Sequence, residues 1–65
     1  MGKIIRVGVF SEYFASKDIW GFNVWAQSNE GKHFHLKESS PTCAAAQTAA
    51  ENLLGTELDS NWEKD

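Results

Sequence analysis

The chain has 65 residues, of which 42% are hydrophobic, and they include three Trp, four Phe and one Tyr. This length allows one hydrophobic core, and the aromatic content excludes a disordered chain. A single Cys excludes an internal disulfide, which fits a reducing compartment, so we expect a cytoplasmic protein. No apolar run approaches the roughly 20 residues of a membrane span, so we expect no signal peptide and no membrane contact.

The net charge of −3 is unevenly distributed along the chain. Residues 1–37 hold five Lys and Arg against three acids, whereas residues 38–65 hold one Lys against six acids. The acidic second half weakens nucleic-acid affinity in general, because that affinity depends on neutralising phosphates. The more basic first half keeps a local nucleic-acid site open as an alternative.

The first predicted strand covers residues 3–14, where β-branched residues alternate with others. One face carries Ile5, Val7 and Val9, and the other carries Arg6, Gly8 and Phe10. Residues 15–18 suit a tight turn into a second strand, and a longer loop over residues 11–18 is the alternative. A turn centred on residues 16 and 17 places Val9 opposite Val24, Val7 opposite Ala26 and Gly8 opposite Trp25.

Residues 20–38 predict two strands joined by Asn29-Glu30-Gly31, a type I turn followed by Gly31 in the left-handed region. The set suited to a core is Phe22, Val24, Ala26, Phe34 and Leu36. The opposite set is Asn23, Trp25, Gln27, His33, His35 and Lys37. The loop pairs Val24 with Leu36, Ala26 with Phe34, Trp25 with His35, Gln27 with His33, and Asn23 with Lys37.

A helix is predicted from Ser40-Pro41 to about Leu54, with Ser40 as the N-cap and Gly55 as the terminator. Its apolar stripe is Cys43, Ala46, Ala50, Leu53 and Leu54, so we expect the Cys43 thiol to be buried. The fold class is therefore α+β, a three-stranded antiparallel β-meander packed on one face by a single C-terminal α-helix (β-β-β-α). Residues 1–55 form this single domain and residues 56–65 an acidic C-terminal tail, whose Leu58 and Trp62 either dock or fray.

Residues 40–54, which follow three strands, resemble the end of a double-stranded RNA-binding domain. Ala45, Ala49, Ala50 and Leu54 fall where that family places packing residues. Thr42, Cys43 and Ala46 stand in place of its phosphate-gripping lysines, so the resemblance implies packing and not RNA binding. The order of elements also resembles the arm-type DNA-binding domains of phage integrases, which implies groove contacts from Arg6, Trp25, His33 and Lys37.

The uncovered sheet face is the best candidate site, because Trp25 lies centrally between Gly8 and His35 among polar groups. Trp25 either covers the bare backbone at Gly8 or anchors a partner. The predicted partner-binding residues are Arg6, Phe10, Asn23, Trp25, Gln27, His33, His35 and Lys37. The leading interpretation is a small non-enzymatic protein-binding module, an adaptor, an inhibitor or a phage- or plasmid-type regulator. Nucleic-acid binding through this face and a homodimer formed through it are the alternatives.

We expect no catalytic residues, no cofactor and no metal. The chain holds no phosphate-loop, dinucleotide, nucleophile-elbow or HExxH motif. His33 and His35 share a strand face, but a metal site needs three or four ligands, and Cys43 belongs to the helix on the other side of the sheet.

Overall fold

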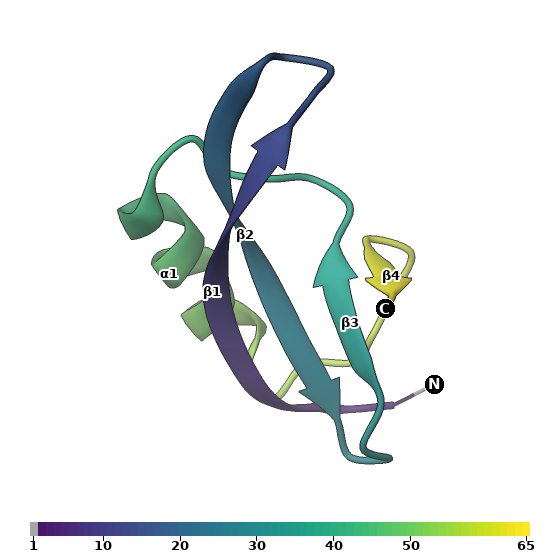
Figure 1. Cartoon of the computed structure of the whole chain (residues 1–65). Helices are drawn as coiled ribbons and strands as arrows, with labels where there is room; N and C mark the ends of the chain where they lie inside the picture. Colours follow the sequence, from purple (N-terminus) through teal and green to yellow (C-terminus); the bar gives the residue numbers. More distant parts are fainter. Residues whose placement is uncertain (1) are drawn as a thin grey trace.

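The computed structural model describes residues 2–65 as one antiparallel four-stranded sheet with one helix packed on one face (Figure 1). The elements in chain order are β1 (Ile4–Phe14), β2 (Ile19–Ser28), β3 (His33–Leu36), α1 (Cys43–Leu53) and β4 (Trp62–Lys64). The strands lie in the order β1-β2-β3-β4. The α+β class is confirmed. The predicted count of three strands and the C-terminal position of the helix are wrong, because β4 follows the helix and extends the sheet beyond β3.

The predicted register is confirmed at the centre of the sheet. Gly8 lies opposite Trp25, and Trp25 lies opposite His35. The loop after β2 has the predicted form, since Gly31 has φ 83° and its N–H donates to the carbonyl of Ser28. The pairing of β2 with β3 is shorter than predicted and ends at the Trp25–His35 pair, so the Val24–Leu36 and Asn23–Lys37 pairs do not form.

A bulge near the start of β1 changes which isoleucine is buried. Ile4 pairs with Ser28 and Arg6 pairs with Gln27, so one extra residue, Ile5, is inserted between the two pairs. Ile4 is fully buried and Ile5 is 51% exposed. The prediction that Ile5 shares the core face with Val7 and Val9 is therefore wrong, because the bulge shifts the alternation by one residue.

The helix begins two residues later than predicted. The hydroxyl of Thr42, not Ser40, caps α1 by accepting from the N–H of Ala45 at 3.2 Å. The backbone of Ser40 instead exchanges two hydrogen bonds with Phe22 of β2. The chain leaves the helix at Gly55, which has φ 85°.

The core lies between the sheet and α1. Ala46 and Ala50 are buried and let α1 lie close against β1 and β2. Cys43 and Leu54 of the predicted apolar stripe are exposed, so the expected burial of the thiol is wrong. Ala45, a packing residue implied by the resemblance to double-stranded RNA-binding domains, is exposed as well. Residues 56–65 contribute two further core side chains, Leu58 and Trp62, and end in β4.

Candidate functional site

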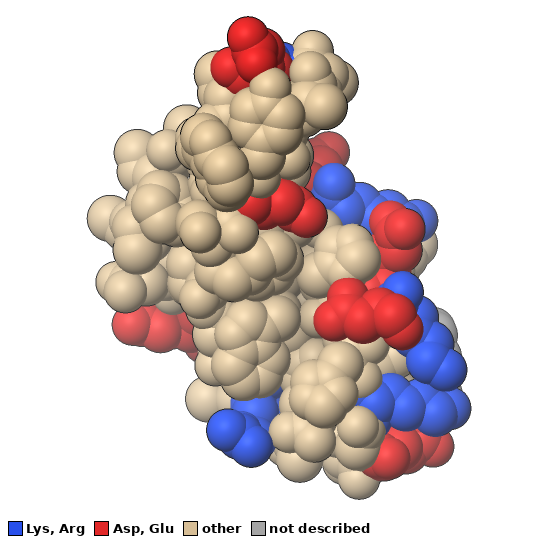
Figure 2. Space-filling model, viewed as in Figure 1, with Lys and Arg blue, Asp and Glu red and all other residues tan. Residues whose placement is uncertain are grey.

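The sheet face opposite α1, called the outer face here, carries the predicted partner-binding residues. By register it comprises Arg6, Gly8, Phe10, Glu12, Phe14, Ile19, Gly21, Asn23, Trp25, Gln27, His33, His35, Lys37, Glu63 and Asp65. Figure 2 shows charged residues gathered over β3 and β4, with mainly uncharged surface over the β1–β2 hairpin.

Trp25 lies flat across the neighbouring strand. A Cβ atom built on Gly8 would overlap the indole ring of Trp25, so only glycine allows the ring to rest there. Trp25 is half-buried as a result, and it bridges β1 and β2 on the outer face. Of the two interpretations of Trp25, the covering of Gly8 is confirmed, and the anchoring of a partner by the exposed part of the indole stays a prediction.

Asn23 is not on the accessible surface, contrary to the prediction. It is 3% exposed, and its amide donates to the carbonyl of Leu36 at 2.8 Å and to the carboxylate of Glu12 at 3.3 Å. Its side-chain oxygen accepts from the N–H of Val24. The bond to Leu36 joins β2 to β3 beyond the end of their backbone ladder, so Asn23 has a structural role.

The two histidines differ in their surroundings. His35 is half-buried between Trp25 and Glu63, and its Nδ1 contacts the carboxylate of Asp65. His33 is exposed, and its carbonyl accepts from the N–H of Asp65 at 3.1 Å. Within residues 2–65, no group of three His, Cys, Asp or Glu side chains is placed to hold a metal ion.

The charges of the outer face nearly balance. Arg6 and Lys37 are exposed and basic, whereas Glu12, Glu63 and Asp65 are acidic. The sequence prediction missed two of these acids because it treated the last ten residues as a tail. Phe10 and Gln27 are half-buried, so both leave part of their side chains accessible.

The far end of the β1–β2 hairpin carries an exposed apolar group that we call the tip patch, made of Tyr13, Ile19 and Trp20. Trp20 is 70% exposed, and Tyr13 and Ile19 are each 46% exposed. The rings of Tyr13 and Trp20 pack at 5.5 Å between centroids with 54° between their planes. In Figure 1 this end of the hairpin extends past α1, which explains the exposure. The sequence alone did not predict that these three side chains are exposed, because their exposure depends on how far α1 extends along the hairpin.

The turn at residues 15–18 contacts the tip patch through Asp18. Asp18 adopts φ 52°, and its carboxylate accepts a hydrogen bond from the Tyr13 hydroxyl. This hydrogen bond, together with partial desolvation, raises the pKa of the Tyr13 phenol above its usual value.

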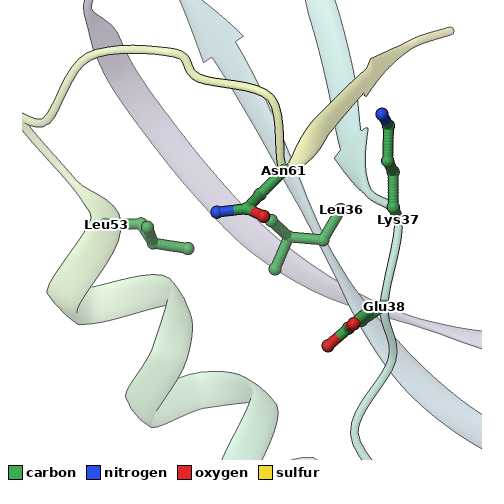
Figure 3. Close-up of a pocket in the computed structure, with 5 residues that line it drawn as sticks. All are labelled: Leu36, Lys37, Glu38, Leu53 and Asn61. Atoms are coloured by element: carbon green, nitrogen blue, oxygen red, sulfur yellow. The ribbon is translucent and has the colours of Figure 1, made fainter.

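A pocket of about 370 Å³ lies on the helix side, between the ends of β3 and α1 and the loop before β4. In Figure 3 the side chains of Leu36 and Leu53 point toward each other across it, and Lys37 points away. Asn61 and Glu38 complete the lining. This apolar pocket with one carboxylate offers no nucleophile paired with a base.

The one helix described, α1, has 11 residues, and no helix within residues 2–65 is long and apolar enough to cross a membrane. Comparisons of the chain with protein-family models, with curated proteins and with solved structures found no match.

Proposed function

We propose that the protein is a small non-enzymatic protein-binding module whose partner docks on the outer face and the adjoining tip patch. The observation that carries this proposal is the exposure of Trp20, Tyr13 and Ile19 together at one end of the molecule. Tryptophan and tyrosine dominate the energetics of protein interfaces, and contiguous exposed apolar surface is typical of an interaction site.

The outer face supplies the rest of the docking surface. Ile19 shares this face with Trp25, whereas Tyr13 and Trp20 pair with each other on the opposite face of the hairpin, so the tip patch reaches both faces at the end of the sheet. Arg6, Gln27, His33, His35 and Lys37 surround the central indole with polar groups. An apolar centre with a polar rim is the usual composition of a protein interface. The exposed, unpaired Cys43 supports a reducing compartment such as the cytoplasm.

Nucleic-acid binding through the same face has less support. Glu12, Glu63 and Asp65 outnumber Arg6 and Lys37, so the face lacks the positive excess that phosphate binding requires.

Affinity capture from the native host, with the proteins identified by mass spectrometry, tests the proposal. We expect a specific protein that the wild-type chain retains and that Trp20→Ala loses, because the substitution removes the largest exposed apolar side chain. Ser16→Ala, an exposed change in the same hairpin, is the matched control and should retain that protein. Equal recovery of every protein by all three chains, each verified as folded, would contradict the proposal.

A further inference from the structure

The first strand forms one edge of the sheet, and its backbone groups point alternately toward β2 and away from it. Phe22 exchanges both of its backbone hydrogen bonds with Ser40, and the N–H of Ser28 donates to Lys32. Even-numbered residues of β2 therefore point toward β3, and odd-numbered ones point toward β1. The β1 residues opposite those odd positions are even-numbered.

It follows that Val7, Val9, Ser11 and Tyr13 direct their N–H and C=O groups to the open edge. No strand among residues 2–65 pairs with this edge beyond the start of β1, where Ile4 bonds to Gly55 and Thr56. Edges of this length are normally protected by charged side chains, Pro or a bulge. From residue 7 to residue 14 this edge has no Pro and no bulge, and Glu12 is its one charged residue.

The sequence of β1 is complementary to itself in one antiparallel register. With a two-fold axis at Val9, Arg6 lies opposite Glu12 of the second copy, and Glu12 lies opposite Arg6 of that copy. Gly8 then lies opposite Phe10 of the second copy, so the Phe10 ring lies beside the Trp25 indole that covers Gly8. Arg6 and Glu12 are the only charged residues from Ile5 to Phe14, and both belong to the outer face.

Neighbouring registers lose this complementarity. An axis at Gly8 places Arg6 opposite Phe10, and an axis at Phe10 places Arg6 opposite Phe14. The axis at Val9 also puts both ion pairs at non-hydrogen-bonded positions, where opposed side chains approach most closely. We propose that two copies of this chain pair through β1 in this register, which joins their sheets into one of eight strands.

The helices permit this pairing. Because α1 packs on β1 and β2 to a similar extent, it lies over that strand pair. Two helices so placed would be two strand spacings apart, about 10 Å, which is a normal packing distance. A depression of about 420 Å³, lined by Gln47 and Glu51 of α1 and by Val7 and Val9, borders the open edge.

Sedimentation of the wild-type chain over a range of concentrations, together with charge-exchanged variants, tests the dimer. We expect a wild-type dimer, and Arg6→Glu should weaken it roughly ten- to hundredfold, because each of two ion pairs becomes a repulsion. Glu12→Arg should do the same. An equimolar mixture of the two variants should recover dimers, because both cross-strand pairs are then opposite in charge. A wild-type chain that stays monomeric, or variants that dimerise as well as the wild type, would overturn the proposal.

Ser11 gives a second, backbone-based test. Ser11→Pro removes an N–H from the open edge without affecting the β1–β2 ladder, so the monomer should fold and the dimer should be lost. Ser11→Ala is the matched control and should dimerise normally. A Ser11→Pro chain that still dimerises would overturn the proposal. The Trp20→Ala chain should also dimerise normally, so a failure of partner capture can be distinguished from a failure of dimerisation.

Discussion

Two contacts in the hairpin restrict which residues can replace Gly8 and Asp18. Trp25 rests on Gly8, and Asp18 holds Tyr13 while adopting a left-handed conformation that Asn and Gly also tolerate. The first contact fixes the Trp25 ring to the sheet, and the second orients the Tyr13 ring in the tip patch. Both contacts therefore shape the proposed docking surface before any partner arrives.

Titration of Tyr13 checks the second contact directly, because it is the only tyrosine in the chain. Asp18 raises the pKa of the phenol in the folded state, so the protonated form is favoured there. The stabilisation is complete below the unfolded pKa of about 10 and is lost as the pH rises through the higher folded value. Ultraviolet titration should show this raised pKa in the wild type. Asp18→Asn, which suits the same backbone angle, should return it toward the ordinary value, and an unchanged midpoint would contradict the assignment.

At the scale of elements, the start of the helix shows a local rule being decided by a distant contact. Ser40 and Thr42 are both suitable N-cap residues, and Pro41 favours the earlier one. The backbone of Ser40 is engaged by Phe22, 18 positions earlier, so the helix begins after Thr42. This pairing across the sheet has no signature in the local sequence.

The cap assignment predicts different effects for two similar substitutions. Thr42→Ala should lower the free energy of unfolding by about 1 kcal/mol, because the N–H of Ala45 loses its partner. Ser40→Ala should change it little, because Ser40 bonds to Phe22 through backbone atoms alone. Urea unfolding of both variants measures the difference. A larger loss at Ser40 than at Thr42 would restore the original sequence-based assignment.

Features set by a few neighbouring residues can be predicted from the sequence, and features set by contacts between distant segments cannot. The alternation from Phe22 to Ala26 and the Gly31 turn fix the central register, because they act over a few residues. The three-residue β4 has too short a pattern to recognise, and its acids suggested a tail. The burial of Asn23 follows from the early separation of β2 and β3, which only the assembled sheet determines.

At the scale of the whole molecule, one helix is too narrow to cover four strands. Helix α1 covers β1 and β2, and residues 56–65 complete the core beside β3 with Leu58 and Trp62. Leu36 of β3 pairs with Trp62 of β4, so residues 56–65 complete the core beside the two strands that α1 does not cover. We conclude that these residues are part of the folding unit.

Removing Trp62 should therefore destabilise the whole protein. Trp62→Ala should cost about 3 kcal/mol or more, the usual range for a buried aromatic residue, which is a large part of the stability of a small domain. Glu63→Ala, an exposed change in the same strand, should alter stability by less than about 0.5 kcal/mol. Thermal unfolding followed by circular dichroism compares the two. Equal melting temperatures would show that residues 56–65 are not part of the core.

The length of the β1–β2 hairpin has a consequence for motion. The molecule measures 34 × 20 × 16 Å, and the hairpin extends past the helix at one end (Figure 1). Amides near the 15–18 turn can open without exposing core side chains, whereas those beside Gly8 and Trp25 lie within the covered half. Hydrogen exchange should therefore slow along the hairpin from the turn toward the core, so the end that carries Trp20 is the part of the sheet best able to adjust its shape.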